Sequence, residues 1–170
     1  MMQGTIELSI LTAMRRLLTF AMLAALVLPA AALARHSGMN DGTLSVRDGR
    51  GTIIIAARGG VIGSFAAGRV TISDPVDGDG TGPIVTGDDW SKERNDTTTT
   101  WGGTRVRFRL IGGAFKVVVR GRGINLSVVG KGSVTLAGAG TADDGSYSVN
   151  GGDYIPIPFQ FQFPLSATSP

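Results

Sequence analysis

The sequence of 170 residues contains no cysteine and only one histidine, His36. Without cysteine the chain forms no disulfide, no cysteine-ligated metal site and no thiol nucleophile. His36 lies in an N-terminal stretch that we expect to fray, so the ordered part of the chain offers no imidazole base to a serine nucleophile. These absences remove most of the side chains on which enzymes depend.

Carboxylates and aromatic residues are also sparse or poorly placed for catalysis. A pair of carboxylates can act as acid and base in glycoside hydrolysis, but Glu93 is the only glutamate beyond residue 34 and the aspartates concentrate in residues 74–96. The few large aromatics either stack on sugar rings or are buried; they are Trp90, Trp101, Tyr147 and Tyr154. We predict a protein that is not an enzyme, with a glycosidase-like enzyme as the weakest alternative.

A short hydrophobic run with a basic start lies near the N-terminus. Residues 14–34 read "MRRLLTFAMLAALVLPAAALA", with an arginine pair, twelve apolar residues, a proline and a final Ala-Leu-Ala. This layout predicts a secretory signal peptide over residues 1–34, with translation beginning at Met14. A retained amphipathic or anchoring helix is the alternative, although a membrane span needs roughly 20 apolar residues. We therefore expect a secreted, extracytoplasmic protein with no stable membrane span after cleavage.

The predicted mature chain, residues 35–170, has the length of one domain. It carries fourteen basic and twelve acidic side chains, a mild excess that, with export, argues against a nucleic-acid partner. We expect a flexible N-terminus at 35–43, an all-β domain at 44–163 with a polar insertion at 74–101, and a flexible tail at 164–170.

The mature chain is built of short runs rich in Val, Ile, Thr and Phe, such as "TIIIAAR", "RVTISD" and "AFKVVVR", each closed by glycine. Runs of this kind every eight to twelve residues are typical of all-β sandwiches and barrels. Gly-Gly, Asp-Gly and Asn-Gly pairs supply the positive φ angles of hairpin turns. We predict an antiparallel meander forming a single sandwich or barrel-like domain. Gly-x-Gly repeats at 121–123, 130–132 and 138–140 leave a short β-solenoid as the alternative.

Basic residues gather in the stretch "TRVRFRLIGGAFKVVVR", residues 104–120. If Gly112-Gly113 is a hairpin turn, one face is apolar, with Val106, Phe108, Leu110, Phe115, Val117 and Val119. The other face then carries five cations, which are Arg105, Arg107, Arg109, Lys116 and Arg120. Like charges directly opposite each other destabilise a sheet. Three interpretations follow: an external anionic wall polymer or glycan, pairing with the aspartate-rich loop, or simple solubility and edge protection.

That aspartate-rich loop reads "SDPVDGDGTGPIVTGDD", residues 73–89. Calcium binds clustered oxygen ligands held by a glycine-containing loop, which makes Asp74, Asp77, Asp79 and Asp88 weak metal candidates. The EF-hand pattern is incomplete, because the twelfth position from Asp77 is an aspartate rather than a glutamate. A solvated, turn-rich loop is the alternative, and we expect no cofactor other than calcium.

The phrases "GGVIGSFAAGRVTISDP", "GTRVRFRLIGGAFKVVVRGRGINLSVVGKGSVTL" and "DDGSYSVNG" span most of residues 44–158. They resemble a family of uncharacterised, glycine-rich exported proteins of bacteria with no established activity. The resemblance implies export to the bacterial cell envelope and a β fold, and it supplies no catalytic residues. We expect a secreted, non-enzymatic envelope or extracellular protein, structural or binding, that engages anionic polymers through the basic hairpin. The alternative is a calcium-dependent carbohydrate-binding module.

Overall fold

The computed structural model describes residues 40–76 and 78–169. The predicted signal peptide and Asp77 lie outside these described residues. Within them the chain is all-β, as predicted, and every strand pairing is antiparallel. The strands are β1 (Gly42–Ser73), β2 (Gly80–Thr86), β3 (Trp90–Asn95), β4 (Thr98–Gly138), β5 (Ser146–Val149), β6 (Ile155–Pro156) and β7 (Phe161–Leu165).

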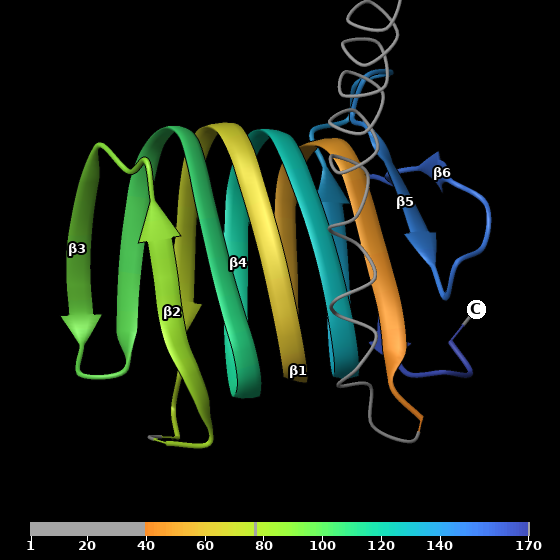
Figure 1. Cartoon of the computed structure of the whole chain (residues 1–170). Coiled ribbons are helices and arrows are strands. Elements are labelled where there is room, and N and C mark those ends of the chain that lie inside the picture. Colours follow the sequence, from red (N-terminus) through yellow and green to blue (C-terminus); the bar gives the residue numbers. More distant parts are fainter. Residues whose placement is uncertain (1–39, 77, 170) are drawn as a thin grey trace, which may run out of the picture. The chain divides into compact units, whose positions relative to one another are not determined.

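Two strands, β1 with 32 residues and β4 with 41, dominate the architecture. Most residues of β1 beyond Gly51 pair with β4 on both sides. Ile53, for example, lies opposite Val119 on one side and Leu136 on the other. The two β4 partners of one β1 residue are 17 or 18 residues apart, so the strands wind around each other. We call this antiparallel winding the β1/β4 coil (Figure 1).

The β1/β4 coil bends at glycines that recur every eight or nine residues. They have positive φ angles and are Gly51, Gly59 and Gly68 in β1 and Gly103, Gly112, Gly121 and Gly130 in β4. They also face one another, since Gly68 lies opposite both Gly103 and Gly121. A Cβ atom on Gly68 would collide with the carbonyl oxygen of Arg120. Glycine alone fits such a corner, because it tolerates positive φ and allows the close backbone approach.

The glycine corners divide the coil into two faces that enclose the core between them. What we call the β2 face contains residues 43–50 and 61–67 of β1 and 104–111 and 122–129 of β4, flanked by β2 and β5. What we call the β3 face contains residues 52–58 and 69–73 of β1 and 98–102, 114–120 and 131–137 of β4, flanked by β3 and β7. A single strand therefore passes through both faces in turn.

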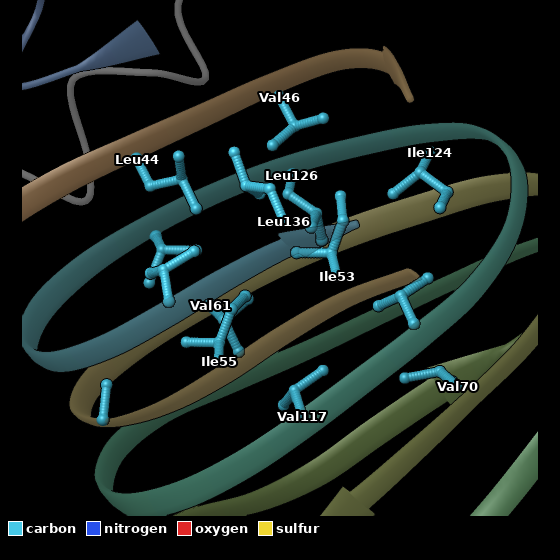
Figure 2. Close-up of a cluster of buried hydrophobic side chains, with 14 of the residues drawn as sticks. Leu44, Val46, Ile53, Ile55, Val61, Val70, Val117, Ile124, Leu126 and Leu136 are labelled. Atoms are coloured by element: carbon cyan, nitrogen blue, oxygen red, sulfur yellow. The ribbon is translucent and has the colours of Figure 1, made fainter. Parts of the chain in front are cut away.

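Alternating side chains of both faces fill the space inside the coil. The fully buried ones include Ile55, Val61, Val70, Val117 and Leu136, and Figure 2 shows strand segments curving around them. Burial of a Val, Leu or Ile side chain stabilises the folded state by about 1.5–3 kcal/mol. The period-two alternation of the two long strands therefore supplies most of one continuous core, which Tyr147, Ile157, Phe163 and Leu165 complete.

The predicted hairpin at Gly112-Gly113 is wrong, because β4 continues through both glycines. Leu110 pairs with Val61 and Phe115 with Ala57, both in β1, rather than with each other. The φ angles of the two glycines, 79° and 77°, suit a hairpin turn as well as a corner of the coil. The buried positions of the predicted hairpin are even-numbered up to Leu110 and odd-numbered from Phe115, so the corner shifts the alternation by one residue, as a two-residue hairpin turn would, and all six residues predicted for the apolar face are buried.

Three predicted boundaries also differ from the structure. At the N-terminus, β1 begins at Gly42, inside the segment 35–43 predicted to be flexible. The polar insertion 74–101 contains β2, β3 and the start of β4. At the C-terminus, β7 ends at Leu165, which is fully buried. The supposed tail is tied down, since Asn150 Nδ2 donates to the carbonyl oxygen of Ser166 at 2.9 Å and the Ser166 N–H donates to Ser169 Oγ at 2.7 Å. The domain therefore extends past residue 163.

Candidate anion-binding surface

The β1/β4 coil concentrates the positive charge of the chain. Its two strands carry eleven basic side chains and a single acidic one, Asp48. The basic residues are Arg47, Arg50, Arg58, Arg69, Arg105, Arg107, Arg109, Lys116, Arg120, Arg122 and Lys131. The other acidic residues lie in the segments that precede, connect or follow these strands. A nearly balanced sequence thus folds into a strongly cationic coil with acidic connections.

The five predicted cations are all exposed, as expected from the alternation, but they do not form one surface. Arg107 and Arg109 lie on the β2 face, as does Arg105, which has a φ of 59° and lies beside the Gly103 corner. Lys116 and Arg120 lie on the β3 face. The prediction of a single basic hairpin is therefore corrected, because the corner at Gly112-Gly113 sends the two halves of the stretch to different faces.

The register instead places other basic residues directly opposite one another. The pairs are Arg50 with Arg122, Arg69 with Arg120, and Arg58 with Lys131. Cβ atoms of directly opposed residues lie about 4.5–5.5 Å apart, and like charges there are destabilising. Among residues 40–76 and 78–169, Arg58 is the only member of these pairs with an ion-pair partner. The sequence gives no direct signal of these pairs, because they depend on the winding of the coil.

Asp79 is the partner of Arg58, with 3.2 Å between Arg58 Nη2 and Asp79 Oδ2. The same oxygen accepts a hydrogen bond from the Ala114 N–H at 3.0 Å. Its other oxygen, Oδ1, is buried and has no hydrogen-bond partner. Within the aspartate-rich loop, this residue therefore acts as a counter-charge for the coil and as a cap for the corner at Gly112-Gly113.

Two further aspartates accept hydrogen bonds from backbone N–H groups, one beside the Gly103 corner and one just past the end of β4. Asp89 Oδ2 accepts from the Thr104 N–H at 3.1 Å, next to Gly103. Asp144 Oδ2 accepts from the N–H groups of Gly140 and Thr141 at 2.7 and 3.0 Å, and the Thr141 hydroxyl donates to Oδ1. The Thr141 hydroxyl bond, helped by these backbone bonds and the charge of Arg50, lowers the pKa of Asp144 although burial opposes the shift.

The predicted metal candidates are spread along the loop. The Asp74 N–H donates to the carbonyl oxygen of Thr97 at 2.8 Å, Asp79 precedes β2, and Asp88 is exposed between β2 and β3. In the part of the chain that the structure describes, no three His, Cys, Asp or Glu side chains come together as a metal site would require. Because Asp77 lies outside that part, calcium binding stays a prediction.

Among the described residues, each face of the coil has a hollow on its outer surface. The larger, about 620 Å³, crosses the β2 face beside Arg107 and Arg109. The smaller, about 200 Å³, lies on the β3 face and is lined by Arg69, Thr71, Val118 and Arg120. Each hollow therefore has two arginines in its lining. The two hollows match in this charge and differ in volume.

Comparison of the chain with protein-family models, curated proteins and solved structures gives no match. The resemblance to glycine-rich exported proteins therefore stays a prediction. None of the described residues belongs to a helix with the length and apolarity needed to cross a membrane. The charged surface of the coil is therefore the feature from which a function can be proposed.

Proposed function

We propose that this chain is a non-enzymatic, extracytoplasmic binding protein that holds anionic polymers through the cationic outer surface of the β1/β4 coil. The observation that carries the proposal is the direct opposition of Arg69 to Arg120 and of Arg50 to Arg122. Among the described residues Arg69, Arg120 and Arg122 have no ion-pair partner, whereas the charge of Arg50 interacts with the carboxylate of Asp144. Wall polymers and acidic glycans are the anions that suit a secreted protein.

Opposed arginines affect both the stability of the free sheet and the affinity for an anion. In the free protein each pair weakens the sheet by roughly 0.2–1 kcal/mol. An anionic group placed between two guanidinium groups replaces that repulsion with charge-assisted hydrogen bonds, which are about twice as strong as neutral ones. The planar donor fork of arginine suits carboxylate, sulfate and phosphate groups. Arginine pairs on a sheet surface therefore favour anion binding and lower the stability of the protein without an anion.

The spread of the cations favours a polymer over a small anion. Arg50 and Arg122 flank the corner row that contains Gly51 and Gly121, and Arg69 lies beside Gly68 of the same row. Arg107 and Arg109 continue the charge across the β2 face. A long chain with repeated charges contacts several of these groups at once, and its effective local concentration then multiplies weak individual contacts.

The test uses fluorescently labelled dextran sulfate, with uncharged dextran of the same length as the control probe. The purified protein should increase the anisotropy of dextran sulfate and leave that of dextran unchanged. Two exposed charge contacts at up to about 1 kcal/mol each correspond to about five- to thirty-fold in Kd. We expect R69Q/R120Q to weaken binding within that range. Equal binding of both probes, or of neither, contradicts the proposal.

A further inference from the structure

The larger hollow has an ordered chemical layout across the β2 face. Its lining follows two rows of outward-facing residues that run across the strands from β2 to β4, β1 and β4 again. One row is Thr86, Arg107, Ser64 and Asn125; the other is Ile84, Arg109, Ile62 and Ser127. We call this hollow the β2-face groove. Two arginines lie in neighbouring rows toward one end, and hydroxyl and amide groups lie toward the other.

The floor of the β2-face groove is shaped by glycine and serine. Gly63 carries no side chain, and a Cβ atom there would collide with the side chains of Phe108 and Leu126, which fill the interior below it. On the outer side, Ser64 and Ser127 are short, whereas Ile62 and Ile84 are longer and exposed to solvent at 39% and 40%. The result is an open depression of about 620 Å³, within the usual range of ligand sites.

The polar groups of the groove are held in place by the fold. Asn125 Oδ1 accepts from the Asp48 N–H at 3.2 Å, and its Nδ2 donates to the carbonyl oxygen of Gly123 at 3.2 Å. The only acidic residue of the coil, Asp48, therefore lies past Asn125, at the end away from the arginines. Arg107 and Arg109 are two positions apart on one strand, about 7 Å along it. The groove thus has an end with two arginines and an end with hydrogen-bonding groups, beyond which Arg47 and Asp48 carry opposite charges.

We infer that the β2-face groove binds a segment of a carboxylated polysaccharide, a chain of uronic-acid type, with the carboxylate on Arg107 and Arg109. The inference rests on the proposed function and narrows its ligand to sugars. A sugar ring combines an apolar C–H face, which packs on Ile62 and Ile84, with hydroxyls that bond to Ser64 and Ser127. A polyanion without rings uses the two arginines but leaves the apolar lining and the hydroxyls without partners.

The first test compares matched double variants, one on each face, with a hexameric oligouronate as the probe. R107Q/R109Q removes two charges from the β2-face groove, and R69Q/R120Q removes two from the smaller hollow on the β3 face. Calorimetric titration should show a loss of about tenfold or more in affinity for the first variant and less than about threefold for the second, and this contrast between two variants that lose the same charge is what assigns the site to the groove. Equal losses in the two variants overturn the inference.

A second variant tests the space rather than the charge. S64L keeps both arginines and fills the middle of the groove, so it should weaken oligouronate binding about tenfold while leaving binding of a polyglutamate of equal charge unchanged. Unchanged oligouronate binding by S64L contradicts the inference, and thermal melting checks that the variant is folded. If all variants keep dextran sulfate binding and show no preference between the probes, the groove is not a sugar site but the proposed function stands. If the wild type binds no polyanion, the proposed function itself is wrong.

Discussion

Arg69 and Arg120 lie directly opposite each other on neighbouring strands of the β3 face, 51 positions apart in the sequence. They line the same small hollow together with Thr71 and Val118. Neither arginine has an ion-pair partner within the described residues. The winding of the coil places cations opposite each other, and their repulsion destabilises the free protein. A bound anion would relieve this repulsion, which connects the fold to the proposed function.

The first prediction concerns that repulsion. R120E converts the pair into a cross-strand ion pair with Arg69, so we expect the free energy of unfolding to rise by about 0.5–1 kcal/mol at low salt. Urea denaturation measures it, and the gain should shrink in high salt. R107E is the matched control, because Arg107 faces Ser64 and Thr86 rather than a cation. A gain of the same size in R107E shows that the opposed pair is not the cause.

A second prediction concerns the glycine corners. Gly68 has a φ of 151° and a backbone oxygen where a Cβ atom would be, so G68A should lower the free energy of unfolding by about 2 kcal/mol or more, or prevent folding. Gly82 has nothing within 4 Å of an added Cβ atom. G82A should therefore be close to neutral, and similar denaturation midpoints for the two variants contradict the assignment of corners.

The third prediction is a dependence of stability on pH. The hydrogen bonds from Thr141 and Gly140 lower the pKa of Asp144 in the folded protein, below the ordinary value of about 3.9. The folded state then binds fewer protons than the unfolded state, so this stabilisation is present above about pH 4 and is lost as the pH falls through the lowered pKa. D144N should be less stable than the wild type at pH 6, and the difference should narrow below pH 4.

T141V provides the second arm of that experiment. It removes the hydroxyl donor to Asp144 while keeping the shape of the side chain. We expect it to reduce the same acid-dependent part of the stability in chemical denaturation curves between pH 2 and 6. A difference between D144N and the wild type that stays constant over this range shows that Asp144 does not titrate as described.

A fourth prediction concerns the aspartate-rich loop. Asp79 already binds Arg58 and the Ala114 N–H, so we expect millimolar calcium and excess EDTA to leave the melting temperature unchanged within about one degree. A ligand that binds only the native state raises its stability by RT ln(1 + [L]/Kd). A rise of several degrees in calcium that EDTA reverses identifies the loop as a metal site instead. D79A should cost about 1–3 kcal/mol, because it leaves the Ala114 donor unpaired.

The all-β class and the inward or outward direction of each side chain were predictable from the alternation of the sequence. Val117 and Val119 are buried while Lys116 and Arg120 are exposed, as the period of two requires. The pairing was not predictable in the same way, because two consecutive glycines with positive φ serve a hairpin turn and a coil corner equally well. The regular spacing of glycine, every eight or nine residues along both long strands, is the feature of the sequence that favours corners of a coil over hairpin turns.

The candidate site could be predicted only in part for the same reason. The alternation of the sequence predicts that Arg107 and Arg109 are exposed cations, but Ser64 and Asn125 join them in the groove only through the register of the coil. The contact of Asp89 with the Thr104 N–H likewise joins residues 15 positions apart, whereas Asp144 binds the N–H of Gly140, four positions before it. The sequence alone does not indicate which backbone N–H groups an aspartate in a connecting segment binds.

The most direct test of the account is the salt dependence of dextran sulfate binding by the full chain. Between 0.1 M and 1 M sodium chloride the Debye length shrinks from about 10 Å to about 3 Å. If the cationic surface of the β1/β4 coil carries the binding, affinity should fall by at least about tenfold, and R69Q/R120Q should show a shallower fall than the wild type. An affinity that does not change with salt, or the same slope for both proteins, contradicts anionic-polymer binding by this surface.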